Sequence, residues 1–229
     1  MANRCHKFNS SSSVTALKPK KFNGSSWVDC PTYRFTSSNS VERIDQQLVT
    51  KTKVIEGYPQ WNGSFRRASS TGVGDYDEAN LYQGKYPSGY KEYKTGVMCF
   101  TDLFTQARNA GTIRKVELRL KNNHAYYNTG LKTRIQGVSS LPASRPSTLD
   151  YGLFGSTVFS SDIKFEKNGS SPIWITLNSD GVNAIRNNQI NGLRVVSPTG
   201  WDLANYGYFE GSNSNRPYIK ITVEYQVWE

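Results

Sequence analysis

The segment YIKITVEYQV (residues 218–227) decides the fold class of this 229-residue chain. Its apolar side chains alternate with polar ones, and they are Ile219, Ile221, Val223, Tyr225 and Val227. A period of two residues puts the apolar side chains on one face of a β-strand and the polar side chains on the other. The segment therefore predicts a strand of an antiparallel sheet with one buried face and one face in water.

The same period recurs in three other segments. IRKVELRLK (residues 113–121) alternates from Val116 onward, TRIQGV (residues 133–138) alternates throughout, and IWITL (residues 173–177) places three apolar side chains on one face. Clusters of Gly, Ser, Asn and Pro separate these segments, and strands do not alternate with helices. The pattern predicts an all-β fold, an antiparallel jelly-roll β-sandwich over residues 62–229.

One short helix is expected among the strands. Asp180 precedes residues 181–188, in which Val182 and Ile185 have helical spacing. A side-chain oxygen at the N-cap accepts a hydrogen bond from a free backbone N–H of the first turn. We therefore expect Asp180 to cap this helix, with Val182 and Ile185 facing inward.

Residues 1–50 differ from the rest of the chain and contain a short repeat. It appears as KFNSS (residues 7–11), KFNGSSW (residues 21–27) and RFTSS (residues 34–38). Asn-Gly in the second unit is a strong hairpin signal, and such small β-units need neighbours to bury apolar surface. We predict an extended, β-rich N-terminal arm for attachment and oligomerisation; a flexible Ser-rich arm is the alternative. The predicted assembly contacts are Phe8, Phe22, Trp27 and Phe35.

Residues 51–61 are predicted to form a linker between the arm and the sandwich. Before them, VERIDQQL (residues 41–48) has near-helical apolar spacing and fits either a short helix or an extended segment. After them, Asn62 and Gly63 predict a second Asn-Gly turn at the start of the sandwich.

The chain is basic, with 28 Lys and Arg against 18 Asp and Glu and a formal net charge of +10. A basic surface suits nucleic acid, teichoic acids or acidic protein neighbours. The basic residues are scattered, however, and are not interleaved regularly with aromatic residues as in a nucleic-acid platform. We therefore expect no nucleic-acid partner, and the simplest interpretation is a soluble basic surface.

The three cysteines, Cys5, Cys30 and Cys99, form no C-x-x-C pair, and their number is odd. This usage argues against a disulfide framework and for folding in a reducing cytosol. Cys99 lies in an apolar run and is predicted to belong to the core.

The first residues lack the apolar stretch of a secretory signal, and no segment approaches the ~20 apolar residues of a membrane span. We therefore expect no membrane partner.

The sequence lacks the usual catalytic signatures. It holds two histidines, His6 and His124, and no nucleophile-elbow, Walker A or dinucleotide-binding motif. We therefore expect a protein that is not an enzyme and has no catalytic residue or cofactor.

The densest acidic group is interpreted as a solvated loop or, alternatively, as a structural Ca²⁺ site. It consists of Asp75, Asp77 and Glu78.

Aromatic residues in predicted loops indicate a binding role. Aromatic rings stack on sugar rings, and neighbouring Asn and Asp side chains bind sugar hydroxyls. The predicted glycan-binding residues are Trp201, Asp202, Tyr126, Tyr127 and Asn205. Packing within the sandwich or at a subunit interface is the alternative for the same aromatic residues.

Several segments of the chain occur in the order found in a known domain. They are ANLYQG (residues 79–84), VMCFTD (97–102), IRKVELRL (113–120), ITL (175–177), NGLRV (191–195), GS (211–212) and RPYIKITVEY (216–225). From Ser64 to Gln226 the chain resembles the DNRLRE-type jelly-roll domain, which is related to carbohydrate-binding modules. The resemblance implies a display or adhesive sandwich without shared catalytic residues, and it implies that VMCFTD is a strand.

A second resemblance concerns the arm. KFNGSSWVD (residues 21–29) is similar to a K-x-W-N-G-S-x-W-V-D unit near the termini of phage tail and appendage proteins, with Phe22 in place of the first Trp. It implies a virion component that is assembled in the host cytoplasm. The expected function is that of a phage tail, baseplate or fibre protein. We expect it to dock through its arm to other virion proteins, to form homo-oligomers and to present the jelly roll to host cell-wall polysaccharide. A head fibre or capsid decoration protein, or a free carbohydrate-binding module, is the alternative.

Overall fold

The computed structural model describes most of the chain. The described residues are 20–29, 33–35, 41–43, 48–67, 72–77, 79–85, 93–126, 129–167, 169, 171–199, 205–212 and 214–228. The chain divides into two units. One is Thr50–Gln226, and the other is Met1–Val49 together with Val227–Glu229.

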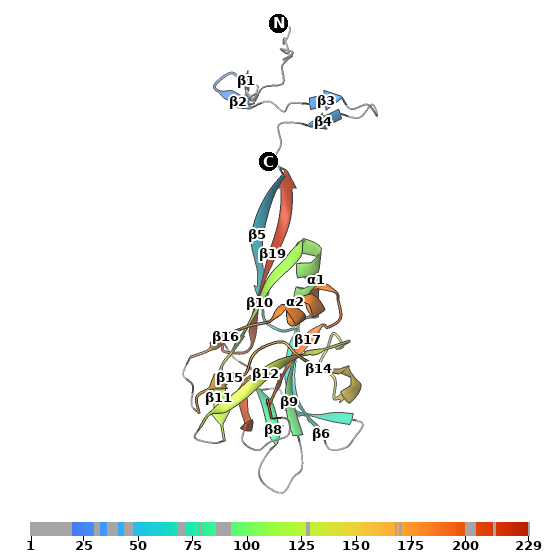
Figure 1. Ribbon diagram of the computed structural model, residues 1–229, viewed down its shortest axis with the longest axis vertical. Helices are drawn as coiled ribbons and strands as arrows, with labels where there is room; N and C mark the ends of the chain where they lie inside the picture. Colours follow the sequence, from blue (N-terminus) through green and yellow to red (C-terminus); the bar gives the residue numbers. More distant parts are fainter. Residues whose placement is uncertain are drawn as a thin grey trace. The chain divides into compact units, whose positions relative to one another are not determined.

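The unit Thr50–Gln226 is an antiparallel β-sandwich (Figure 1). The order of its smaller sheet is β16 (Ile173–Thr176), β10 (Thr112–Leu120), β19 (Tyr218–Trp228) and β5 (Leu48–Gly57). The order of its larger sheet is β11 (Asn122–Ala125), β18 (Gly207–Glu210), β8 (Asn80–Lys85), β9 (Tyr93–Cys99), β17 (Gly192–Val196), β12 (Leu131–Val138) and β14 (Phe154–Val158).

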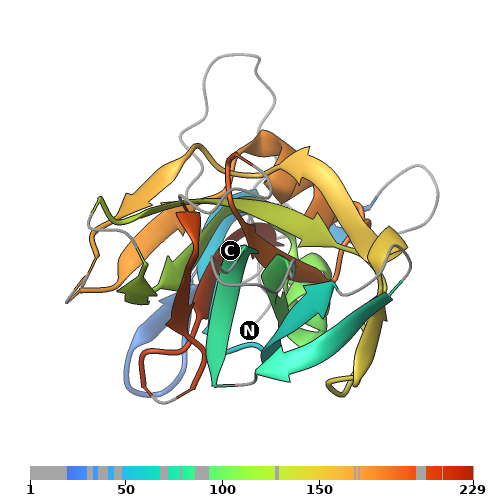
Figure 2. The same ribbon diagram turned by 90° about the horizontal axis from the view of Figure 1, so that it is seen from below.

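Four further strands extend the larger sheet. They are β6 (Trp61–Arg67), β7 (Gly72–Asp77), β13 (Thr148–Asp150) and β15 (Ile163–Phe165). The unit also contains the helices α1 (Thr101–Ala110) and α2 (Ser179–Arg186) and the 3₁₀ turn η1 (Tyr151–Leu153). Viewed from below in Figure 2, strands from early in the sequence (teal and green) lie beside strands from its end (orange and red), as β8 does beside β18. The predicted all-β sandwich is confirmed.

The main core lies between the two sheets and follows the predicted alternation. Ile219, Ile221 and Val223 of β19 are fully buried, whereas the side chains between them are half-buried. The largest fully buried side chains of this core include Phe100, Phe104, Phe165, Phe209 and Leu118. Each such side chain stabilises the fold by about 1.5–3 kcal/mol relative to its exposed state.

A β-bulge in β10 explains why its alternation begins only at Val116. Ile113 pairs with Val223 and Lys115 pairs with Thr222, so Arg114 is an extra residue on this strand. A bulge shifts the alternation of side chains by one position. Ile113 and Val116, three residues apart, are therefore both fully buried.

A second apolar cluster lies apart from the main core. Its buried members are Trp61, Phe65, Val97, Cys99, Val138, Leu141 and Leu149. The indole Nε1 of Trp61 donates a hydrogen bond of 2.8 Å to the carbonyl oxygen of Pro142, which ties β6 to the segment after β12. Cys99 is fully buried, so its predicted place in the core is confirmed.

The strand predicted over residues 97–102 is wrong in its last three residues. β9 ends at Cys99, and α1 begins at Thr101. Phe104 and Ala107 of α1 are three residues apart and are both fully buried, which is helical spacing. The apolar run that ends at Phe100 hides the boundary between strand and helix in the sequence.

The helix predicted after residue 180 forms, but its cap differs from the prediction. α2 begins at Ser179, and the side-chain oxygen of Asn178 accepts a hydrogen bond of 3.0 Å from the backbone N–H of Gly181. Asp180 therefore lies within the first turn and is not the N-cap. Val182 and Ile185 are buried, as expected.

Residues 51–61, expected as a linker, contain most of β5 and the first residue of β6. The expected turn at Asn62 and Gly63 is also wrong, because both residues lie inside β6 and pair with β9. Gly63 serves packing instead: a Cβ there would lie 2.5 Å from Nε of Arg145.

Within residues 20–43 of the other unit, the described residues form two hairpins. β1 (Lys20–Phe22) pairs with β2 (Trp27–Asp29), and β3 (Tyr33–Phe35) pairs with β4 (Val41–Arg43). The predicted Asn-Gly hairpin is thus confirmed, with a four-residue loop in which Gly24 has φ 103°. The Asn23 side-chain oxygen accepts hydrogen bonds from the backbone N–H groups of Ser25 and Ser26. The segment 41–48, expected as a helix or an extended segment, contains β4 and the first residue of β5.

Candidate functional site

The strands β11, β18 and β8 bring aromatic residues from distant parts of the sequence into one cluster. Tyr208 pairs in register with Tyr82 and with His124, and its ring centroid lies 4.8 Å from Tyr82 and 5.4 Å from His124. The Tyr206 ring lies 6.0 Å from Tyr82. Aromatic pairs between neighbouring strands stabilise a sheet face, and they leave the ring edges at the surface. We call these four side chains, with Tyr126, the tyrosine cluster.

A lysine holds the tyrosine cluster together from within. Lys94 of β9 is only 7% exposed, and its Nζ lies 4.8 Å from the Tyr82 ring centroid and 5.7 Å from that of Tyr206. A cation over an aromatic face is attracted by the electrons of the ring, more strongly when water is excluded. The rings of Tyr82 and Tyr206 therefore share one buried cation.

Two predicted glycan-binding segments meet at this cluster. The backbone N–H of Tyr126 donates a hydrogen bond of 3.0 Å to the carbonyl oxygen of Tyr206, and their ring centroids are 6.4 Å apart. Tyr126 is 43% exposed, which leaves ring surface for stacking. The structure thus brings residues 126 and 205–206 together beside the paired strands β11 and β18, whereas Trp201, Asp202 and Tyr127 lie outside the described residues.

Asn205, also predicted to contact glycan, is 8% exposed and engaged within the protein. Its side-chain oxygen accepts a hydrogen bond of 2.9 Å from the Lys132 backbone N–H, and its side-chain nitrogen donates one of 3.0 Å to the Thr199 hydroxyl. The amide of Gln83 donates to the Asn205 carbonyl oxygen. Asn205 therefore anchors the chain just before Tyr206 and β18.

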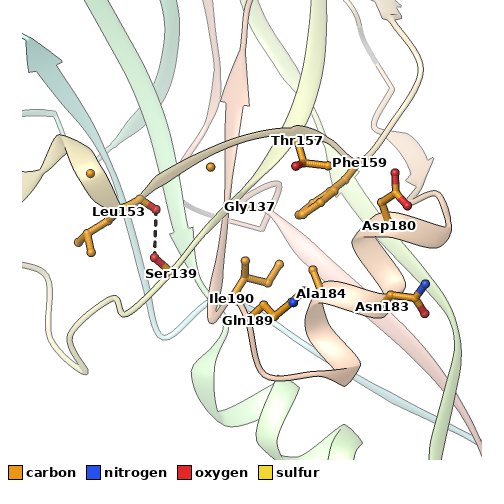
Figure 3. A pocket seen from close by; sticks show the side chains of 12 residues that line it. Gly137, Ser139, Leu153, Thr157, Phe159, Asp180, Asn183, Ala184, Gln189 and Ile190 are labelled. Atoms are coloured by element: carbon orange, nitrogen blue, oxygen red, sulfur yellow. Dashed lines mark hydrogen bonds between the residues drawn. The ribbon is translucent and has the colours of Figure 1, made fainter.

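An open pocket of about 460 Å³ lies between α2, the end of β12 and the segment η1–β14 (Figure 3). Phe159, Ala184 and Ile190 supply buried apolar surface to it. Figure 3 shows Asp180 and Asn183 on α2 along one side, with Thr157 beside Phe159. None of the twelve lining residues is Lys, Arg or His.

The polar groups of the pocket suit a neutral ligand that carries hydroxyls. Within the described part of the chain, the Asp180 carboxylate, the Thr157 hydroxyl and the Gln189 side-chain amide have no hydrogen-bond partner. A carboxylate accepts hydrogen bonds from hydroxyls, and an amide both donates and accepts. An apolar floor with a few polar groups at its edge is the usual composition of a small-ligand pocket. Sequence reasoning missed this pocket because its residues come from separate elements and form no motif.

The remaining predicted site residues lie in strands or outside the described residues. Asp75 and Asp77 lie in β7 and not in a loop, with Asp77 paired to Ser64, while Glu78 is outside the described part. Among described side chains, no group of three or more His, Cys, Asp or Glu has the arrangement of a metal site.

The predicted assembly residues occupy equivalent places in the two hairpins. Phe22 and Trp27 pair with each other at the closed end of the first hairpin. Phe35 occupies the equivalent position of the second, where it pairs with Val41. Phe8 lies outside the part of the chain that the structure describes.

Comparison with known proteins adds no relative: no family model and no curated protein matches the chain. None of the described helices is long and apolar enough to cross a membrane.

Proposed function

We propose that this chain is a non-enzymatic virion structural protein of a phage tail, baseplate or fibre. In this proposal the N-terminal arm docks to neighbouring virion proteins, and the jelly roll is displayed and adheres to host cell-wall glycan. The observation that carries it is the contrast between a sandwich with a complete core and an arm whose described elements are hairpins of three-residue strands.

The arm supports docking because hairpins of this size are at best marginally stable in water. The repeat units recognised in the sequence mark the hairpins: Phe22 ends the first strand of one hairpin, and Phe35 ends the first strand of the other. Apolar aromatic residues at equivalent positions suit contacts with partner subunits. The proposed partners are other virion proteins and further copies of this chain, assembled in the host cytoplasm, without nucleic acid or membrane.

The sandwich supports adhesion through the tyrosine cluster and the pocket beside α2. The first offers an exposed ring at Tyr126 on an aromatic base, and the second offers hydroxyl-binding groups over an apolar floor. Both features suit sugar rings, which present hydroxyl groups at their edges and C–H groups on their faces.

The test is the location of the chain in purified phage particles. Immunogold electron microscopy with an antibody to the sandwich is expected to label the tail, baseplate or fibre. A chain that lacks residues 1–47 is expected to fold but to be missing from particles. Absence of the full chain from particles would overturn the proposal, and label on the head would favour a head fibre or decoration protein.

A further inference from the structure

The outer face of the smaller sheet carries an unusual group of aromatic and basic side chains. We call it the aromatic–cationic face, and its members are Glu56, Tyr58, Arg119, Trp174, Arg216, Tyr218 and Lys220. The strand register explains the gathering: Arg119 of β10 pairs with Trp174 of β16 on one side and with Tyr218 of β19 on the other. Side chains paired in register on neighbouring strands project from the same face.

The rings of this face contact one another through their edges. Tyr218 lies at the centre, with its ring centroid 4.8 Å from Tyr58 at 76° and 6.3 Å from Trp174 at 84°. Trp174 remains 41% exposed and Tyr58 39% exposed. Large aromatic side chains that gather on a surface, rather than in a core, mark an interaction site more often than isolated ones do.

Each ring also has a cation over it. The Arg216 guanidinium lies 4.0 Å from the Tyr58 ring centroid, Lys220 Nζ lies 4.9 Å from that of Trp174, and Arg119 lies 5.3 Å from that of Tyr218. These contacts hold the long basic side chains and the rings in one arrangement. A preordered surface loses less conformational entropy when it binds a ligand.

The charges of the face are unbalanced. Its three cations and the neighbouring Lys115 share it with two described carboxylates. Glu56 lies 3.6 Å from Lys220 Nζ, and Glu117, which pairs in register with Lys220, lies 2.7 Å from Lys115 Nζ. Burial, followed by the neighbouring Glu56 and Tyr58, raises the pKa of Tyr218 above its usual range. The surface therefore presents positive charge, aromatic rings and hydrogen-bonding groups within one patch.

We propose that the aromatic–cationic face binds an acidic polysaccharide whose sugar rings carry carboxylate groups. A sugar ring stacks on the exposed part of Trp174 or Tyr58, and the sugar carboxylates pair with Arg216 and Lys220. Glu56 accepts hydrogen bonds from sugar hydroxyls. The inference rests on the proposed role in adhesion and names a ligand class and a surface separate from the tyrosine cluster.

The same features disfavour single-stranded nucleic acid as the occupant. Successive bases stack on adjacent rings that are parallel, whereas the adjacent ring pairs of this face, Tyr58–Tyr218 and Trp174–Tyr218, meet nearly at right angles. Glu56 also repels a phosphate backbone. A hydroxyl-rich polyanion tolerates that carboxylate because its hydroxyls donate hydrogen bonds to it.

The test compares two polymers that have the same sugar backbone. The full chain is titrated calorimetrically with polygalacturonate and with its methyl ester, which lacks the charge. We expect binding of polygalacturonate that weakens as ionic strength rises, and much weaker binding of the ester. Equal binding of both polymers, or tighter binding of a single-stranded oligonucleotide than of polygalacturonate, would overturn the proposal.

Matched variants locate the binding site. Trp174→Ala is expected to weaken binding about tenfold, and Arg216→Gln with Lys220→Gln is expected to abolish the preference for the acidic polymer. Trp228→Ala, which removes an exposed ring ten residues further along β19, and Lys132→Gln with Lys164→Gln, which removes two charges from the larger sheet, are expected to bind as the parent does. Unchanged binding by Trp174→Ala and the Arg216/Lys220 variant, with their circular dichroism spectra unchanged, would refute the site.

The two proposals fail in different ways. A chain that is incorporated into particles but does not discriminate the two polymers contradicts the ligand proposal alone. A chain that binds polygalacturonate but is absent from particles contradicts the virion proposal alone.

Discussion

The sandwich and the N-terminal arm are both built from antiparallel strands, but they differ in what lies beside each strand. β10 has a partner on either side and a buried face packed on the opposite sheet. Within the described residues, β1 and β3 each pair with a single strand of three residues. A strand pair contributes little stability until a buried face is added to its hydrogen bonds.

This difference teaches that stability and attachment are assigned to separate parts of the chain. We therefore expect substitutions in the sandwich to lower its free energy of unfolding and substitutions in the arm to leave it unchanged. The difference should be largest for a substitution in the core. It would disappear if the arm folded together with the sandwich.

The largest effect is expected from a cavity in the core. Phe209→Ala removes a fully buried ring that packs 4.9 Å, edge to face, from Phe165. We expect a loss of about 3–5 kcal/mol in the free energy of unfolding, measured by urea denaturation with circular dichroism. Trp27→Ala in the arm serves as the comparison and is expected to leave this free energy unchanged. A comparable loss in the arm variant would mean that the arm is part of the cooperative unit.

Two glycines sharpen the comparison, because both have positive φ in very different surroundings. Gly111 ends α1 with φ 144° and ψ −154°, and a Cβ there would lie 2.2 Å from the carbonyl oxygen of Glu224. Gly111→Ala is therefore expected to cost about 2–5 kcal/mol from backbone strain and collision. Gly24 in the arm has φ 103°, and a Cβ there would have no neighbour within 4 Å among the described residues. Gly24→Ala should therefore strain its hairpin without changing the unfolding of the sandwich.

Equal midpoints of urea unfolding for the Gly111→Ala and Gly24→Ala variants would contradict that comparison. Gly155→Ala provides a control within the sandwich, because Gly155 is exposed and the closest neighbour of a Cβ there would be the Gly137 carbonyl oxygen at 3.3 Å. We expect this variant to unfold within about 0.5 kcal/mol of the parent.

A smaller effect is expected at the start of α2. Asn178→Ala removes the side-chain oxygen that accepts the hydrogen bond from Gly181, and should cost about 1 kcal/mol. Asp180→Ala removes a first-turn carboxylate that is not the cap, and its cost should be lower, about 0.3–1 kcal/mol. Thermal unfolding followed by circular dichroism ranks the two variants, and the reverse order would restore Asp180 as the capping residue.

Much of the sandwich was predictable because its central strands have one buried face and one face toward solvent. β10, β12, β16 and β19 show this alternation directly in sequence. β5 does not, since Ile55 alone among its side chains is buried. Gly63 misled the prediction for a different reason: its missing side chain makes room for Arg145, more than eighty residues away, and local sequence does not reveal such a contact.

The candidate sites were predictable only where one segment carried the signal. Tyr126 and Asn205 were singled out as loop residues, and the pairing of β11 with β18 brings their segments together. The pocket unites Phe159, Asp180 and Gln189 from three places, and the aromatic–cationic face depends on strand order. Neither arrangement has a sequence motif, because both are created by packing between elements.

Substitutions of the aromatic residues in the arm should have the smallest effect on the stability of the sandwich but a large effect on incorporation into particles. Phe22→Ala and Phe35→Ala change the equivalent positions of the two hairpins, at the ends of β1 and β3. We expect no change in sandwich unfolding, because these residues belong to the other unit, but a marked loss of the chain from purified particles when both are combined. Lys20→Gln, at the other end of β1, keeps the aromatic residues and should be incorporated normally. Quantitative immunoblotting of particles measures the loss. Normal incorporation of the double variant would mean that docking does not use the aromatic positions of the repeat, and that the arm attaches through its backbone or its charges instead.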